Sequence, residues 1–269
     1  MVLPSRFPRH QVLGIIGCQI FEDEIAHVVY NDLEVTNVYV IDSDESKGII
    51  NKIRRLDPEK KVVRMAEEWL ETATVPRERS IIIWMKPISL HQSPAKLRED
   101  VTSAIYRIRH ICHSIMLFYG ICGNAFRSID EIAKRAKAKV VILKDEKGYI
   151  VDDCICTMVG GTEEYLEQLR SSSLAFQFTP MWAANWRRFF NEFQILRNPD
   201  DMEQAQIIFE NMGYDKVLKL ETGLGNRKAF DDQIKEFSDK FSLKVESFEC
   251  TLRVVDSSYK KARQLLGAR

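Results

Sequence analysis

Three of the six cysteines of this 269-residue chain stand where α/β proteins place reactive side chains. Cys18 directly follows the apolar segment 11–17, and Cys122 lies between two glycines in the turn after segment 114–119. Cys154 stands at the expected start of a helix, where a thiol has a lowered pKa. The thiolate binds metals and attacks electrophiles, so the three thiols are candidates for a metal site or a nucleophile. Taken singly, each is better explained as a small buried side chain.

Two further side chains are candidates for a fourth ligand or for a hydrogen bond to a ligand. His91 lies just past segment 79–86, and Asp153 precedes Cys154 and can cap its helix. For His91 alone, a loop histidine bonded to the backbone is the more common explanation. No residue has a pattern that assigns it a catalytic role.

The pocket around these thiols is expected to include Tyr119, Gly123, Asn124 and Trp182. Trp182 begins an aromatic-rich helix over 182–193, so packing in the core explains it equally well. Three thiolates with one open position suit Zn²⁺, which lowers the pKa of a bound thiol or water. The same three thiolates also suit a [4Fe–4S] cluster with one open iron. Thiolates are soft ligands, and both zinc and iron–sulfur clusters bind such ligands well.

Segments with strand and helix patterns alternate along the chain, and this order must position the thiols. It predicts an α/β fold, with a mainly parallel, doubly wound sheet and helices on both faces. We expect one domain over 1–269, with the option of two closely packed Rossmann-like lobes at about 11–110 and 111–269. Apolar spacing also predicts a helix over 58–73. In such sheets, ligands bind beyond the carboxyl ends of the strands.

Composition narrows the class of protein. Lys and Arg together number 39, as do Asp and Glu, so the formal net charge is zero. This balance argues against binding to nucleic acid or to an anionic membrane. The apolar runs are too short to span a bilayer, and the N-terminal residues show no apolar signal core. We therefore expect a cytosolic protein with free thiols.

Five motifs follow one another in a distinctive order: SLHQSPAKL, LFYGICGN, VDDCI with a following VGG and Tyr, FTPMW, and YDKVLKLETGLGN. Together they resemble an archaeal and bacterial family, domain of unknown function 1638, from about Cys18 to the last helix. The resemblance implies that Cys18, Cys122, Cys154, His91 and Asp153 match family positions. The family usually has a histidine where this chain has Asp152. Its members often accompany corrinoid proteins and methyltransferases.

Two main hypotheses follow. In the first, the chain is a zinc or iron–sulfur protein of corrinoid-dependent methyl transfer, with Cys18, Cys122 and Cys154 as ligands. In the second, it is a non-catalytic accessory protein that docks on a methyltransferase or a corrinoid protein. A third reading is a small-molecule enzyme with Cys122 or Cys154 as a metal-free nucleophile.

Overall fold

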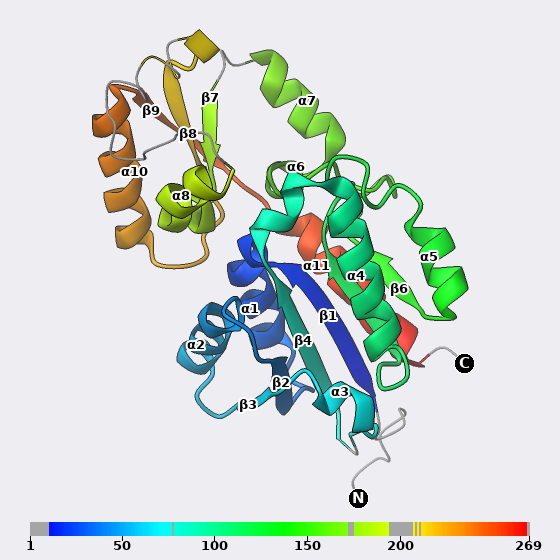
Figure 1. Cartoon of the computed structure of the whole chain (residues 1–269). Coiled ribbons are helices and arrows are strands. Elements are labelled where there is room, and N and C mark those ends of the chain that lie inside the picture. Colours follow the sequence, from blue (N-terminus) through cyan, green and yellow to red (C-terminus); the bar gives the residue numbers. More distant parts are fainter. Residues whose placement is uncertain are drawn as a thin grey trace, which may run out of the picture. The chain divides into compact units, whose positions relative to one another are not determined.

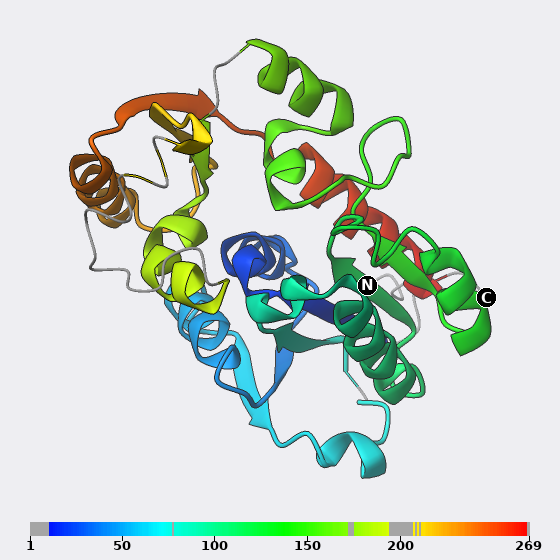
Figure 2. The same cartoon turned by 45° about the horizontal axis from the view of Figure 1, so that its top comes forward.

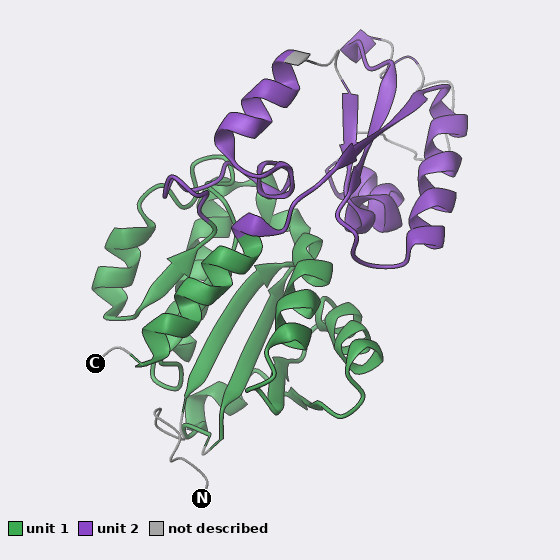
Figure 3. Cartoon of the chain, turned by 180° about the vertical axis from the view of Figure 1, so that it is seen from behind, with its two compact units in different colours: residues 1–143, 255–269 green, residues 144–254 purple. Residues whose placement is uncertain are grey.

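The computed structural model describes residues 11–76, 78–171, 175–193, 207, 209 and 211–267. The chain forms two compact units, coloured separately in Figure 3. Unit 1 comprises Met1–Leu143 and Val255–Arg269, and unit 2 comprises Lys144–Val254. Each unit has its own parallel sheet and its own apolar core.

Unit 1 is built on a six-stranded, all-parallel sheet with the order β3-β2-β4-β1-β5-β6 (Figure 1). The strands are β1 (Val12–Cys18), β2 (Asn37–Ile41), β3 (Lys61–Met65), β4 (Ser80–Lys86), β5 (Ser114–Phe118) and β6 (Val140–Ile142). Every residue of β1, β4 and β5 is buried, because helices cover both faces of these central strands. Their uninterrupted apolar character in the sequence reflects this burial.

Helices cover both faces of this sheet (Figures 1 and 2). The chain leaves β1 toward β2 and β3, and leaves β4 toward β5 and β6. Since parallel crossovers are right-handed, the helices of the two series cover opposite faces. One face carries α1 (Glu22–Asn31) and α2 (Ser46–Leu56); the other carries α4 (Pro94–Ile108) and α5 (Ile129–Ala136). Short helices are η1 (Gln19–Phe21), α3 (Trp69–Thr72) and η2 (Ile88–Gln92).

The C-terminal helix α11 (Arg253–Gly267) packs beside α1 within unit 1. The hydroxyl of Tyr259 donates to Asp32 Oδ2 at 2.6 Å, and Arg263 pairs with the same carboxylate at 2.9 Å. These buried contacts fix the end of the chain to the loop after α1.

Unit 2 contains a smaller parallel sheet with the order β7-β8-β9. Its elements are α6 (Cys154–Val159), α7 (Thr162–Ser171), β7 (Ala175–Phe178), α8 (Pro180–Glu192), β8 (Lys216–Glu221), α10 (Arg227–Phe241) and β9 (Lys244–Glu249). Helices α8 and α10 pack on one face through a core of aromatic rings around Phe178, Phe190 and Phe237. The opposite face packs Leu218 and Leu220 against α6.

The α/β fold and its parallel sheet agree with the sequence prediction, but one element does not. The predicted helix over 58–73 is wrong: the segment forms β3 and the short α3. Two valines in β3 pair with β2 at the sheet edge, where tertiary pairing outweighs local spacing. The division into compact units falls after Leu143, because β5 and β6 belong to the same sheet as β1. Most of the helix predicted over 199–213 lies outside the described residues.

Candidate functional site

The carboxyl edge of the unit 1 sheet brings side chains from three adjacent strands together. Cys18 at the end of β1 pairs in register with Lys86 at the end of β4. On the other side, Gly17 pairs with Phe118, so Tyr119 stands next to Cys18. Because β1 and β4 send the chain in opposite directions, their ends form the switch point where such sheets bind ligands.

These side chains point toward α4. A Cβ added at Gly14 would lie 2.8 Å from Ile108 of α4, so this residue of β1 faces that helix. Cys18 lies two residue pairs further along the strand and therefore shares the face. Lys86 confirms the direction, since its Nζ lies 2.8 Å from Asp100 Oδ1 on α4. The site thus lies between the sheet and the start of α4.

Tyr119 is the centre of this group. Its side chain is fully buried, and its hydroxyl has no hydrogen-bond partner among the described residues. Burial raises the pKa of Tyr119 well above its ordinary value, and the nearby Cys18, Cys122 and Asp100 raise it further. The last effect shows that both cysteines lie within electrostatic range of this hydroxyl.

His91 lies over the ring of Tyr119, with the two rings stacked and their centroids 6.0 Å apart. Its Nδ1 donates to the carbonyl of Ile88 at 3.2 Å, because a carbonyl oxygen only accepts. In the neutral ring, Nε2 then carries the lone pair. Burial lowers the pKa of His91, which favours this neutral form. Metal-binding histidines commonly have this arrangement.

Cys18 is a buried thiol in the absence of a bound ion. Its side chain is 1% exposed, and burial raises its pKa to about 12, with Glu22 adding to the shift. The sequence suggested a thiolate-forming position, but the folded environment favours the protonated thiol. A bound cation would have to displace that proton.

Cys122 has an unusual backbone. It adopts φ 47°, and Gly123 and Asn124 follow at 61° and 80°, so three successive residues have left-handed geometry. A non-glycine residue in this region is uncommon, and strained residues of this kind cluster at functional sites. The turn closes through a hydrogen bond from the Ala125 N–H to the Cys122 carbonyl. The thiol is thus held at a position that local preferences disfavour.

Gly123 and Asn124 line a hollow of about 500 Å³ beside α4. Arg98 of α4 and Arg135 of α5 contribute to its walls. Tyr119 is not part of this lining, because it is buried beneath the turn. The residues predicted to share one pocket therefore divide within unit 1 between a buried cluster and a surface hollow.

The other predicted residues belong to unit 2, where Asp153, Cys154 and Trp182 line a pocket of about 390 Å³. The carboxylate of Asp153 caps α6 by accepting from the Cys156 N–H at 2.9 Å. Burial raises the pKa of Asp153, and the charge of Asp152 adds to the shift. Tyr165 lies against these groups: burial, followed by Asp153 and Asp152, raises its pKa to about 12.

No group of three or more His, Cys, Asp or Glu side chains in the described part of the chain is gathered as a metal site. In unit 1, Cys18, Cys122 and His91 surround Tyr119 without converging on one point. In unit 2, Cys154 and Asp153 are neighbours at the start of α6. The ligand set predicted from sequence is therefore distributed over both units.

Sequence reasoning missed several residues of these sites. Lys86 and Asp100 form an ion pair beside Tyr119, and Tyr165 and Tyr214 form walls of the unit 2 pocket. The sequence does indicate the position of Lys86, since this residue ends the same apolar segment that precedes His91. No feature of the sequence indicates that Tyr165 and Tyr214 line a pocket, because only the folded unit brings their segments together.

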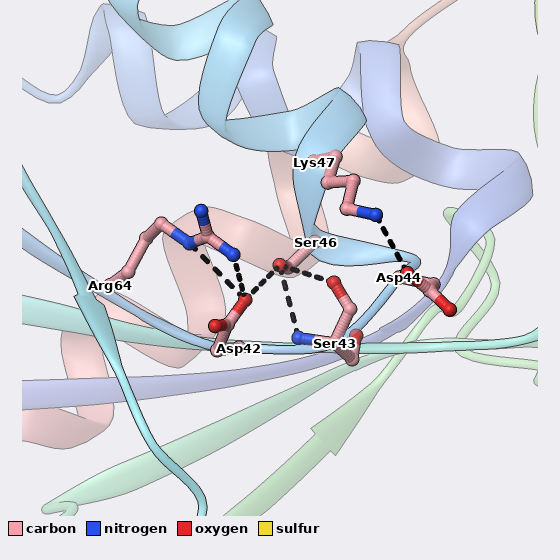
Figure 4. Close-up of polar contacts among 6 residues, drawn as sticks. All are labelled: Asp42, Ser43, Asp44, Ser46, Lys47 and Arg64. Carbon is pink, nitrogen blue, oxygen red and sulfur yellow. Dashed lines mark hydrogen bonds and ion pairs between the residues drawn. The ribbon is translucent and has the colours of Figure 1, made fainter.

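Two other clusters of polar side chains lie at this edge of unit 1, and their hydrogen bonds and ion pairs are made within the protein. After β2, Asp42 pairs with Arg64, and the Ser46 hydroxyl donates to the Ser43 carbonyl at 2.8 Å (Figure 4). This network closes the loop before α2.

The other group lies at the start of α1, where Glu22 and Asp23 share Lys52 at 3.3 and 2.7 Å. Glu24 beside them is almost fully buried, and burial raises its pKa to about 8, with Asp23 as the next cause. Burial within this acidic turn thus favours the protonated form of Glu24.

The fold and site together define a doubly wound α/β protein with a thiol, imidazole and phenol cluster at the switch point of its larger sheet. A family model described as "Protein of unknown function (DUF1638)" matches residues 85–259. This match covers more than half of the chain, and the chain belongs to that family. No curated protein matches the chain significantly. Among the described residues, no helix is both long and apolar enough to cross a membrane.

Proposed function

We propose that this chain is a cytosolic metal-binding protein of corrinoid-dependent methyl transfer. Its ligands in unit 1 are Cys18, Cys122 and His91, and the metal is zinc. The supporting observation is the fully buried Tyr119 hydroxyl, which lacks a partner among the described residues and lies in range of both thiols. A buried hydroxyl without a partner costs about 1–3 kcal/mol. A thiolate or metal-bound water would satisfy it.

The donor set favours zinc over an iron–sulfur cluster. Two thiols and one imidazole with an open fourth position form a known catalytic zinc set, whereas [4Fe–4S] clusters need more thiolates. The hydrogen bond of His91 Nδ1 to Ile88 leaves Nε2 as the ligand atom. Binding requires the side chains of His91 and Cys122 to rotate toward Cys18, with release of the thiol proton.

A bound zinc ion would supply a deprotonated thiol that accepts a methyl group. Two residues of the chain would assist the thiolate. Lys86 adds positive charge beside Cys18, and Tyr119 orients the thiolate by donating a hydrogen bond. The motif resemblance implies a setting beside corrinoid proteins and methyltransferases, and the proposed methyl-transfer role rests on that implication. We therefore propose a corrinoid protein or a methyltransferase as the partner.

The first experiment is metal and acid-labile sulfide analysis of protein purified without oxygen. We expect about one zinc per chain and no sulfide for the wild type. Cys122→Ser and His91→Ala proteins should lose most of this zinc. Cys112→Ala is the matched control, since Cys112 lies at the opposite edge of the same sheet, after α4. Its zinc content should equal that of the wild type.

Iron together with acid-labile sulfide would show that the bound group is an iron–sulfur cluster and not zinc. A wild-type zinc content in Cys122→Ser protein would contradict the proposed site. Cys154→Ser tests the third thiol predicted from sequence. Its zinc content should equal that of the wild type, since the proposed ligands all lie in unit 1.

A second experiment tests the role separately from the metal. Methylcobalamin and a small thiol are mixed with the zinc-loaded protein, and formation of cob(I)alamin is followed by absorbance. The thiolate takes the methyl group, and the electron pair of the methyl–cobalt bond stays on cobalt. We expect turnover by the wild type and none by Cys122→Ser. Zinc-loaded protein without turnover would contradict the methyl-transfer role.

A further inference from the structure

Four of the ten residues that line the pocket of unit 2 are aromatic. Tyr165 comes from α7, Phe176 from β7, Trp182 from the first turn of α8, and Tyr214 from the segment before β8. With a volume of about 390 Å³, the pocket accommodates a small organic molecule. Four rings from four parts of the unit thus surround one space.

The core of unit 2 holds these rings in place. Phe176 packs edge-on against Phe190 at 5.6 Å and against Tyr214 at 5.5 Å. Trp182 packs edge-on against Phe189 at 4.8 Å, and Phe189 is fully buried. Because the walls are already fixed, a ligand orders few side chains when it binds.

The charged side chains of the pocket lining indicate the sign of the charge on the ligand. Among the described residues that line the pocket, Asp153 is the one charged side chain, and Lys, Arg and His are absent. Its carboxylate is oriented by the hydrogen bond from the Cys156 N–H. An anion would therefore meet like charge and no group of opposite charge, whereas a cation would meet a carboxylate and aromatic side chains.

The chemistry of the walls selects the kind of cation. A small metal ion needs several oxygen ligands, which a single carboxylate does not provide. Aromatic faces attract a cation whose charge is spread over alkyl groups, and the attraction grows when water is excluded. We propose that this pocket binds a small quaternary or alkylated ammonium ion, with Asp153 as counter-ion. The inference goes beyond the proposed function because it uses neither Cys18 nor Cys122.

The test is a calorimetric titration of the full chain with tetramethylammonium chloride at constant ionic strength. Neopentyl alcohol, which has a similar branched shape without the charge, is the comparison ligand. We expect tetramethylammonium to bind at least about tenfold more tightly than the alcohol, since the ring faces and the carboxylate act on charge.

Matched variants locate the binding. Trp182→Leu and Tyr165→Leu should each weaken tetramethylammonium binding by about tenfold, whereas Trp182→Phe keeps a ring and most of the affinity. Asp153→Asn keeps the helix cap but removes the charge, and it should also weaken binding. Tyr149→Leu is the control, because Tyr149 is an exposed tyrosine of unit 2 outside the pocket lining. Thermal unfolding identifies variants that fail to fold.

Several results would overturn the proposal. These are no heat of binding by tetramethylammonium in a folded wild type, equal affinity for the neutral alcohol, or unchanged affinity in folded Trp182→Leu and Tyr165→Leu proteins. Zinc content is unaffected by any of them, so this inference and the proposed zinc site can fail independently.

Discussion

At the scale of single residues, the backbone conformation of Cys122 disfavours cysteine, whereas the proposed metal site requires its thiol. Its left-handed φ of 47° costs a non-glycine residue about 1–2 kcal/mol, and glycine would avoid that cost. Lys137 and Ser242 take similar φ values of 51° and 54° at helix ends, so strain alone does not assign a function to Cys122. Under the proposed zinc site, metal binding by the thiol is the reason for cysteine at this position.

Substitutions of Cys122 should have opposite effects on stability and on metal content. Cys122→Gly should keep or raise the free energy of unfolding, by up to about 1 kcal/mol, while zinc is lost. Cys122→Val should lower it by about 1–2 kcal/mol, because a β-branched residue is strained in this region. Urea unfolding measures both variants. If Cys122→Gly were markedly less stable than the wild type, the thiol would serve the fold.

The positions of the thiols at strand ends could be predicted, since apolar runs mark the strands before Cys18 and Cys122. Their common neighbour could not be predicted. Tyr119 meets Cys18 only because β5 lies beside β1, and sheet order is set by long-range pairing. The backbone strain at Cys122 was also hidden, because nothing in the glycine-rich turn shows which residue takes positive φ.

At the scale of elements, the start of α1 carries a pH-dependent contribution to stability. The pKa of Glu24 rises from its ordinary value of 4.5 to about 8, chiefly through burial. Between these values the folded protein holds a proton that the unfolded chain has released. The stabilisation is complete below pH 4.5 and is lost as the pH rises through 8.

The variant Glu24→Gln should remove this dependence. Its amide has nearly the same shape as the neutral carboxyl and does not ionise. We expect the free energy of unfolding of the wild type to fall more steeply than that of the variant between about pH 5 and 8. Urea unfolding at several pH values measures the two slopes. Equal slopes would show that Glu24 is ionised in the folded protein.

The elements themselves show why one prediction failed. Most strands of the larger sheet are apolar and buried on both faces, so their sequences are unambiguous. β3 is an edge strand with charged residues at both exposed positions, and its two valines fit helical spacing as well. Only pairing with β2 distinguishes the two structures.

At the scale of the whole molecule, two units with separate sheets and cores should respond separately to damage. Phe237 is fully buried and contacts several rings in the core of unit 2. Phe237→Ala should cost about 3–5 kcal/mol and act on that unit. We expect amide hydrogen exchange to accelerate in β7, β8 and β9, while β1, β4 and β5 stay protected.

A matched change in unit 1 provides the control. Ile15→Ala removes a fully buried side chain from β1, so it should accelerate exchange in the larger sheet instead. Uniform acceleration over both sheets in either variant would mean that the chain unfolds as one cooperative body. The sequence predicted an alternating parallel fold, but it could not place the division, which depends on the strands that β5 and β7 join.

X-ray absorption at the zinc edge is the most direct test of the proposed zinc binding by Cys18, Cys122 and His91. For protein purified without oxygen, we predict two sulfur neighbours at about 2.3 Å and nitrogen or oxygen neighbours at about 2.0–2.1 Å. Cys122→Ser protein loaded with zinc should lose one sulfur. A zinc shell without sulfur, or one unchanged by Cys122→Ser, would contradict the account.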